Sequence, residues 1–135
     1  MNSTNRWIKG AALIAAAVIL TSCMPKVVPE GYALLGKREV NFGLDRDTIR
    51  VDRAAGPISQ LMIVATFNPV EVHTIRVFFE NGATFDANVR ERLFVGRDRL
   101  LIDLPGGARK ISEVTFRYRK VNDAVRRAVV ELWGK

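Results

Sequence analysis

The chain has 135 residues, 48% of them hydrophobic, a net charge of +7 at neutral pH and one cysteine. A single cysteine excludes an intramolecular disulfide, so the fold depends on packing alone. Fifteen of the 21 basic residues are arginine, whose planar guanidinium group suits carboxylates and phosphates. The charge therefore indicates either an anionic partner or ordinary solubility with ion pairs to the 14 acidic residues.

The beginning of the chain has the organisation of a secretory signal peptide. Arg6 and Lys9 precede a ten-residue apolar run, Ala11 to Leu20, and no acidic residue comes before it. A helix that spans a bilayer needs about 20 apolar residues, roughly twice this length. The pattern favours an export signal over an uncleaved transmembrane anchor.

Leu20-Thr21-Ser22-Cys23 closes that run. This motif resembles the lipobox of bacterial prolipoproteins, in which leucine and two small residues precede a lipidated cysteine. The resemblance implies a diacylglyceryl group on the Cys23 Sγ, cleavage between Ser22 and Cys23, and an acyl chain such as palmitate on the new amino group. Several acyl chains on one residue would hold the protein firmly on a membrane. The alternative is a free or dimer-forming thiol.

The residue after the cysteine influences whether a bacterial lipoprotein stays in the inner membrane or moves to the outer membrane. Met24 stands where the inner-membrane retention signal of lipoproteins has aspartate, so the resemblance implies an outer-membrane anchor with the domain facing the periplasm. Pro25 and Pro29 favour extended backbone, so residues 23–31 are expected to form the lipidated cysteine and a tether.

Removal of the expected signal peptide, residues 1–22, takes away two cations and lowers the charge from +7 to +5. The 113 residues that remain suit a single domain, 32–135, with one core. Export also argues against nucleic acid as a partner.

From Tyr32 onward, short apolar or alternating segments between turn residues predict strands. Asn81-Gly82 predicts a hairpin because both residues tolerate positive φ, and Pro105-Gly106-Gly107 predicts another turn. The charged stretches 45–47 and 90–92 are expected in loops. The expected strands are Tyr32–Phe42, Thr48–Val51, Ile58–Phe67, Val70–Phe79, Thr84–Val89, Arg99–Leu104 and Ile111–Tyr118.

Alternation along these strands predicts which side chains are buried. The expected inward set is Leu61, Ile63, Ala65, Phe67, Ile75, Val77, Phe79, Val114, Phe116 and Tyr118. His73 has the parity of Ile75, and we expect it to be partly buried and satisfied by a neighbour.

The last segment, Ala124–Trp133, is compatible with a helix capped by Asn122-Asp123 or with a strand. The β-branched run Ala128–Trp133 favours a strand. With it, about eight strands without a crossover helix predict an all-β fold, an antiparallel β-sandwich or small barrel. The domain also resembles small exported β-rich bacterial domains of unassigned function. The likeness rests on Leu35-Gly36-Lys37-Arg38, Asp45-Arg46-Asp47, Ile102-Asp103-Leu104-Pro105-Gly106-Gly107 and Val130-Glu131-Leu132-Trp133-Gly134.

The chain shows no pattern typical of an enzyme. His73 is the only histidine, and the pattern of Asp45, Asp47 and Asp52 predicts salt-bridged turns rather than a calcium loop. A hydrolase would have to use acids such as Asp45, Asp47 and Asp103. We therefore expect no catalytic residue, metal or cofactor, while the hydrolase remains the rival hypothesis.

Three arginines are expected to point away from the core: Arg76, Arg117 and Arg119. On neighbouring strands they would form a patch for phosphates or carboxylates, the alternative being a solvated face with cross-strand ion pairs. The leading hypothesis is a membrane-anchored envelope lipoprotein with a non-enzymatic binding or structural β-domain. Its partner would be an envelope protein or an anionic envelope polymer. An alternative is binding of anionic glycan or lipid headgroups through these arginines.

Overall fold

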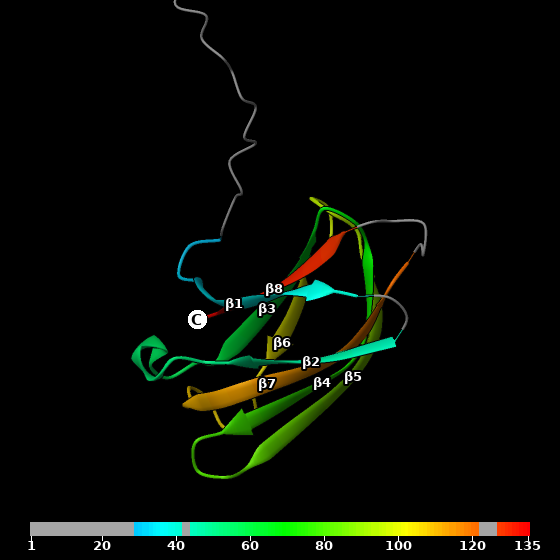
Figure 1. Ribbon diagram of the computed structural model, residues 1–135. Helices are drawn as coiled ribbons and strands as arrows, with labels where there is room; N and C mark the ends of the chain where they lie inside the picture. Colours follow the sequence, from blue (N-terminus) through cyan, green and yellow to red (C-terminus); the bar gives the residue numbers. More distant parts are fainter. Residues whose placement is uncertain (1–28, 42–43, 122–126) are drawn as a thin grey trace, which may run out of the picture.

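The computed structural model describes residues 29–41, 44–121 and 127–135 (Figure 1). In this part of the chain, eight strands form two four-stranded antiparallel sheets that pack as a β-sandwich. The all-β antiparallel sandwich expected from the sequence is therefore confirmed. The expected signal peptide, the lipobox Leu20–Cys23 and most of the tether lie outside the described residues.

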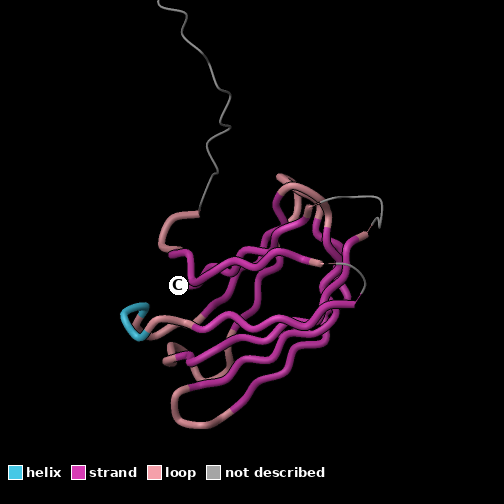
Figure 2. The backbone as a smooth tube through the Cα atoms, in the orientation of Figure 1, coloured by secondary structure: helices cyan, strands magenta, loops and turns pink. Residues whose placement is uncertain are grey.

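One sheet has the strand order β1-β8-β3-β6, and the other has the order β2-β7-β4-β5. The described residues contain one helical turn, η1, Arg53–Ala55 (Figure 2). The strands are β1 Ala33–Val40, β2 Leu44–Arg50, β3 Gln60–Thr66, β4 Val70–Phe79, β5 Thr84–Leu93, β6 Leu100–Asp103, β7 Ile111–Lys120 and β8 Ala128–Gly134.

The two ends of the sandwich differ in what they carry. Ala33 pairs with Gly134, so the chain enters and leaves the sheets at one end, here called the entry end (Figure 1). The β4–β5 hairpin at Asn81-Gly82, which the sequence predicted, also lies there, with Gly82 at φ 86°. The opposite end, called the far end, carries the β3–β4 turn and the β5–β6 loop.

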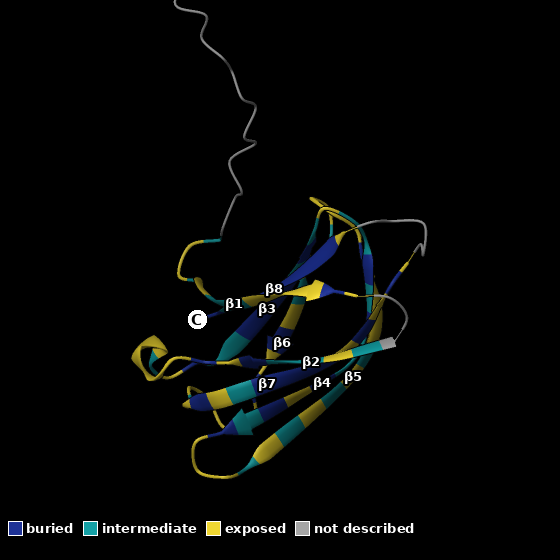
Figure 3. Cartoon of the chain, in the orientation of Figure 1, coloured by how far each residue is buried: buried dark blue, intermediate teal, exposed yellow. Residues whose placement is uncertain are grey.

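The core lies between the two sheets, and alternation directs every second side chain of a strand into it (Figure 3). Nine of the ten residues expected to be inward are buried: Leu61, Ile63, Ala65, Ile75, Val77, Phe79, Val114, Phe116 and Tyr118. The expectation for Phe67 is wrong. β3 ends at Thr66, and Phe67 turns outward with 60% of its surface exposed.

A glycine lets the two sheets approach each other along one side. A Cβ at Gly36 in β1 would lie 2.5 Å from the Ile49 Cγ2 of β2. Since β1 and β2 belong to different sheets, the absence of a side chain at residue 36 permits this close contact. The Arg38 Nε then donates to the carbonyl oxygen of Thr48 across the same seam at 3.2 Å.

Two stretches expected as charged loops are in fact strand. Residues 45–47 lie in β2 and residues 90–92 lie in β5. In β2, the Tyr118 hydroxyl donates to Asp47, and Asp45 accepts from the backbone N–H of Asn41 at 2.7 Å. These partners satisfy the acids within the sheet, which their charge alone does not reveal. The strand favoured for Ala128–Trp133 is confirmed as β8, while residues 124–126 lie outside the described residues.

Candidate functional site

The outer face of the β2-β7-β4-β5 sheet carries a row of four polar residues across four adjacent strands. Arg46 of β2 lies opposite Arg117 of β7, Arg117 lies opposite Thr74 of β4, and Thr74 lies opposite Asn88 of β5. These four residues are here called the arginine row. The row combines two guanidinium groups, a hydroxyl and an amide, all of which can donate hydrogen bonds to an anion.

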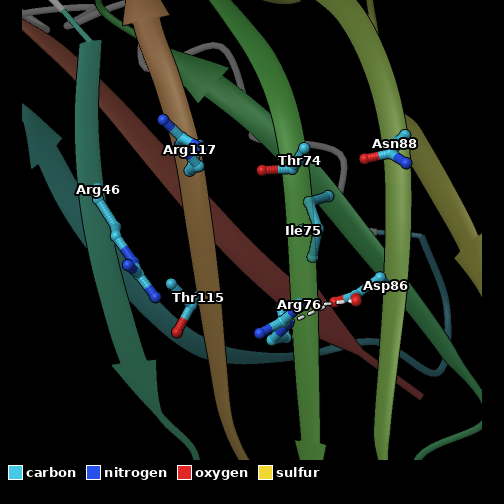
Figure 4. A pocket seen from close by; sticks show the side chains of 8 residues that line it. All are labelled: Arg46, Thr74, Ile75, Arg76, Asp86, Asn88, Thr115 and Arg117. Carbon is cyan, nitrogen blue, oxygen red and sulfur yellow. Dashed lines mark hydrogen bonds and ion pairs between the residues drawn. The ribbon is translucent and has the colours of Figure 1, made fainter.

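A shallow groove lies over the arginine row (Figure 4). One cavity of about 330 Å³ is lined by the whole row together with Ile75, Arg76, Asp86 and Thr115. A second cavity of about 540 Å³ shares Thr74, Asn88 and Arg117 with the first and adds His73 and Arg90. Because the cavities share three residues, they form one groove across β7, β4 and β5, which the side chain of Arg46 reaches from β2.

The two arginines of the row are not neutralised by acids. Both side chains are exposed, and among the described residues no acidic group or hydrogen-bond acceptor pairs with either guanidinium group. Arg46 extends from β2 toward Thr115 of β7 (Figure 4). Like charges directly opposite each other on antiparallel strands are destabilising. The pairing of Arg46 with Arg117 therefore does not stabilise the sheet.

Arg76, one of the three arginines predicted from the sequence, is paired within the groove. Its Nε and Nη2 donate to the two carboxylate oxygens of Asp86 at 2.6 and 2.9 Å (Figure 4). This bidentate pair lowers the pKa of Asp86 and raises the pKa of Arg76. Arg76 thus contributes donors to the groove wall, while its charge is balanced by Asp86.

Arg119, another of the three, belongs to an ion-pair cluster one row nearer the far end. The Glu71 carboxylate lies 3.1 Å from the Arg92 Nε, 3.3 Å from the Arg119 Nε and 2.8 Å from the His73 Nε2. Hydrogen bonding to Arg92 is the largest cause that lowers the pKa of Glu71, with Arg119 and His73 acting in the same direction. These residues, Glu71, His73, Arg92 and Arg119, are here called the Glu71 cluster.

The three predicted arginines do lie on adjacent strands, since β4 and β7 are neighbours. Arg76 and Arg119 pair with acids, and Arg117 does not. Arg46 was missed as a candidate because the sequence shows it between two aspartates. The feature that could have identified Arg46 is the alternation of β2. It points Arg46 outward, while the next residue, Asp47, accepts from the hydroxyl of the buried Tyr118.

A local irregularity shapes the groove beside the arginine row. The register of β4 shifts between Val72 and Thr74 against both neighbouring strands. On β5, Arg90 has a left-handed backbone with φ 43°, which is uncommon outside glycine. Bulges re-aim side chains and are frequent beside functional sites.

The same register shift corrects the expected orientation of the histidine. Val72 and Ile75 are both buried, so alternation is interrupted between them and His73 leaves the inward parity of Ile75. His73 is half-buried, as expected, and its Nε2 lies 2.8 Å from the Glu71 carboxylate. The geometry of this contact is not that of a hydrogen bond, so the expectation that a neighbour satisfies the ring is met by proximity to an acid only. It reaches the groove from the Glu71 cluster.

The acids of the rival hydrolase hypothesis do not meet in one cavity. Asp47 accepts from Tyr118, whose pKa is raised by burial and by this hydrogen bond. Asp103 lies on β6 of the other sheet and accepts from the Gln60 Nε2 at 2.7 Å. Within the described residues, no group of three potential metal ligands is close enough to hold an ion.

These features define a β-sandwich domain with an arginine-lined groove on one outer face. The chain belongs to the family described as a domain of unknown function, DUF2541, whose model matches residues 12–134. A comparison with curated proteins finds no match. In the part of the chain that the structure describes, no helix is long and apolar enough to cross a membrane.

A comparison with solved structures finds a similar chain in a structural and functional characterization of Pseudomonas aeruginosa AlgX. The TM-score is 0.44 and the sequence identity is 12%, over 76% of this chain and 26% of the AlgX chain. The present chain thus spans about a quarter of that protein's length.

Proposed function

We propose that this protein is a lipid-anchored, non-enzymatic binding protein of the bacterial envelope. Its ligand would be an anionic group, the carboxylates or phosphates of an envelope glycan or of lipid headgroups. The observation that carries the proposal is the cross-strand pair of Arg46 and Arg117, exposed in a groove and not neutralised by acids among the described residues.

The energetics support binding over a purely structural role for this pair. A guanidinium group already paired with a carboxylate must give up that partner before it binds a ligand, whereas Arg46 and Arg117 have no such cost. Two adjacent guanidinium groups create a local positive potential that an anion relieves. Thr74 and Asn88 add neutral donors beside the charges, as hydroxyl-bearing sugars or headgroups require.

The test is titration of the detergent-extracted full chain with polygalacturonate, a carboxylate probe, and with inorganic polyphosphate, a phosphate probe. A charge-assisted hydrogen bond contributes about 1.5–3 kcal/mol, so Arg117→Ala should weaken binding by about 10- to 150-fold. Arg46→Ala should have a comparable effect. Binding should also weaken as salt is raised, because exposed charges are screened.

Two control variants separate the groove from general charge. Arg53→Ala removes the same charge from η1 at the entry end and should leave affinity within about twofold of wild type. Arg76→Ala should weaken binding less than Arg117→Ala, because Asp86 already occupies that guanidinium group. Equal losses from Arg53→Ala and Arg117→Ala, or binding that ignores salt, would show that the groove is not the site.

The anchor part of the proposal rests on Arg6, Lys9, the apolar run and the lipobox that ends at Cys23. Its test is the intact mass of protein extracted from membranes, with Cys23→Ser alongside. We expect the wild-type mass to correspond to a chain that starts at residue 23 and carries acyl chains. Cys23→Ser should lose these chains and leave the membrane fraction. An unmodified full-length mass for the wild type would rule out lipidation.

A further inference from the structure

The far end of the sandwich exposes a cluster of apolar side chains on neighbouring strands and turns. The Val121 N–H donates to the Pro69 carbonyl, and Val70, which follows Pro69, lies opposite Leu93, which precedes Phe94. The β3–β4 turn therefore sits between the end of β7 and the start of the β5–β6 loop (Figure 1). The exposed residues, here called the apolar tip, are Phe67 at 60%, Phe94 at 37%, Val95 at 45% and Val121 at 36% exposure.

The most exposed residue of the apolar tip is held in a strained backbone conformation. Phe67 has φ 69°, in the left-handed region that bulky residues rarely adopt. The Asn68 N–H donates to the Thr66 carbonyl at 2.9 Å and closes a tight turn around it, and the Asn68 side chain donates to the Arg127 carbonyl. A fold that only needed this turn would be better served by glycine. The strain therefore indicates a function for an exposed aromatic ring.

Arginines accompany both aromatic rings. The Arg127 guanidinium carbon lies 4.2 Å from the centre of the Phe67 ring, and that of Arg97 lies 4.8 Å from the centre of the Phe94 ring. Residues 90–99 contain four arginines and two acids, a net charge of +2. Both arginines also have an acidic neighbour, since the Arg97 Nε lies 3.4 Å from Asp98 and the Arg127 Nε lies 3.9 Å from Glu39. These pairs are exposed, and exposed pairs contribute little stability, so a lipid phosphate can replace the acid. Aromatic rings beside cations suit the boundary between acyl chains and anionic headgroups.

We infer that the apolar tip docks on the surface of an anionic lipid bilayer, with Phe67 and Phe94 entering the headgroup region and Arg97 and Arg127 facing lipid phosphates. Exposed apolar surface gains free energy when it leaves water, and the positive charge adds attraction to anionic lipids. This surface is separate from the groove, and the inference holds whether or not the groove binds an anion.

The experiment is amide hydrogen exchange of the anchored full chain in two kinds of vesicle. One contains phosphatidylcholine alone, and the other contains phosphatidylcholine and phosphatidylglycerol in equal parts. Exchange in segments 66–69 and 94–97 should slow by about fivefold or more on the anionic vesicles, while the entry-end turns at 81–83 and 105–108 should change by less than about twofold.

Variants determine which side chains produce the protection. Phe67→Gly suits the backbone at this position and should reduce the protection of segment 94–97, whereas Phe67→Trp should retain it. Arg127→Glu should reduce the preference for anionic vesicles, with Arg53→Glu at the entry end as the control of equal charge. Arg46→Ala with Arg117→Ala should leave the protection intact, which separates this test from that of the groove.

Three outcomes would overturn the inference. The first is an exchange rate at the tip that is the same on both kinds of vesicle. The second is protection around Leu34 and Leu101 on the other sheet in place of protection at the tip. The third is protection that appears only when a protein partner is added, which would assign the tip to protein recognition.

Discussion

Two neighbouring rows on the same sheet face use arginine in opposite ways. In the Glu71 cluster, one carboxylate lies within 3.3 Å of a nitrogen from Arg92, Arg119 and His73. In the arginine row next to it, Arg46 and Arg117 face each other without an acid among the described residues. The comparison teaches that arginine content alone does not define a binding surface. A surface becomes available to an anion where the register leaves guanidinium groups unmatched.

The largest effect on the stability of the fold should come from removing the acid of the Glu71 cluster. Glu71→Gln leaves Arg92, Arg119 and His73 close together without their shared carboxylate. We expect a loss of about 1 kcal/mol in the free energy of unfolding, the upper range for an exposed ion-pair network. Urea unfolding measures this change. Arg92 and Arg119 would then lack an acidic partner, so the affinity of the protein for polyphosphate should also rise. The Glu71 cluster would in this way become an anion-binding surface like the arginine row.

The pH dependence checks the same assignment. The pKa of Glu71 is lowered in the folded protein, chiefly by Arg92, so its contribution is present above the ordinary glutamate pKa. That contribution is lost as pH falls through the lowered pKa. The stability difference between wild type and Glu71→Gln should therefore be constant near neutral pH and shrink in acid. A difference that persists unchanged in strong acid would assign the effect to packing instead.

A smaller change in stability, of opposite sign, should follow when an acidic residue is introduced into the arginine row. Arg46→Glu replaces a repulsive cross-strand pair with an attractive one opposite Arg117. We expect the free energy of unfolding to rise by about 0.2–1 kcal/mol, measured by thermal melting. Arg46→Gln, the matched control, removes the repulsion only and should give a smaller gain.

Anion binding by the two variants at residue 46 distinguishes a binding role for Arg46 from a structural one. Both substitutions at residue 46 should weaken binding even though they leave the fold as stable as the wild type or more so. A site kept for binding at the expense of stability behaves in this way. If Arg46→Glu instead lowered the melting temperature, Arg46 would have a structural role and the contrast between the two rows would fail.

Sequence reasoning predicted the outline of the fold because alternation and turn residues act locally. The alternation of Val114, Phe116 and Tyr118 requires one buried face, and Asn81-Gly82 permits a tight hairpin. Both predictions are confirmed. Local rules failed at Phe67 and His73. There the chain leaves the strand or shifts register, and alternation no longer predicts the buried face.

The candidate site could be predicted only in part. Outward alternation identified Arg117, and it identified Arg76 and Arg119 equally well, although their charges are balanced by Asp86 and Glu71. Arg46 lies 71 positions before Arg117 in the sequence, and no local pattern links the two. Only the pairing of β2 with β7 places them opposite each other.

The sequence by itself therefore determined an all-β chain, its strand alternation and the lipobox-like motif from which the anchor is proposed, because each depends on residues close together in the chain. The tertiary structure decided which strands are neighbours and in what register. Strand order and register set which charges face each other, and these pairings arise between segments far apart in sequence. The groove at Arg46 and Arg117 and the apolar tip around Phe67 are consequences of those pairings.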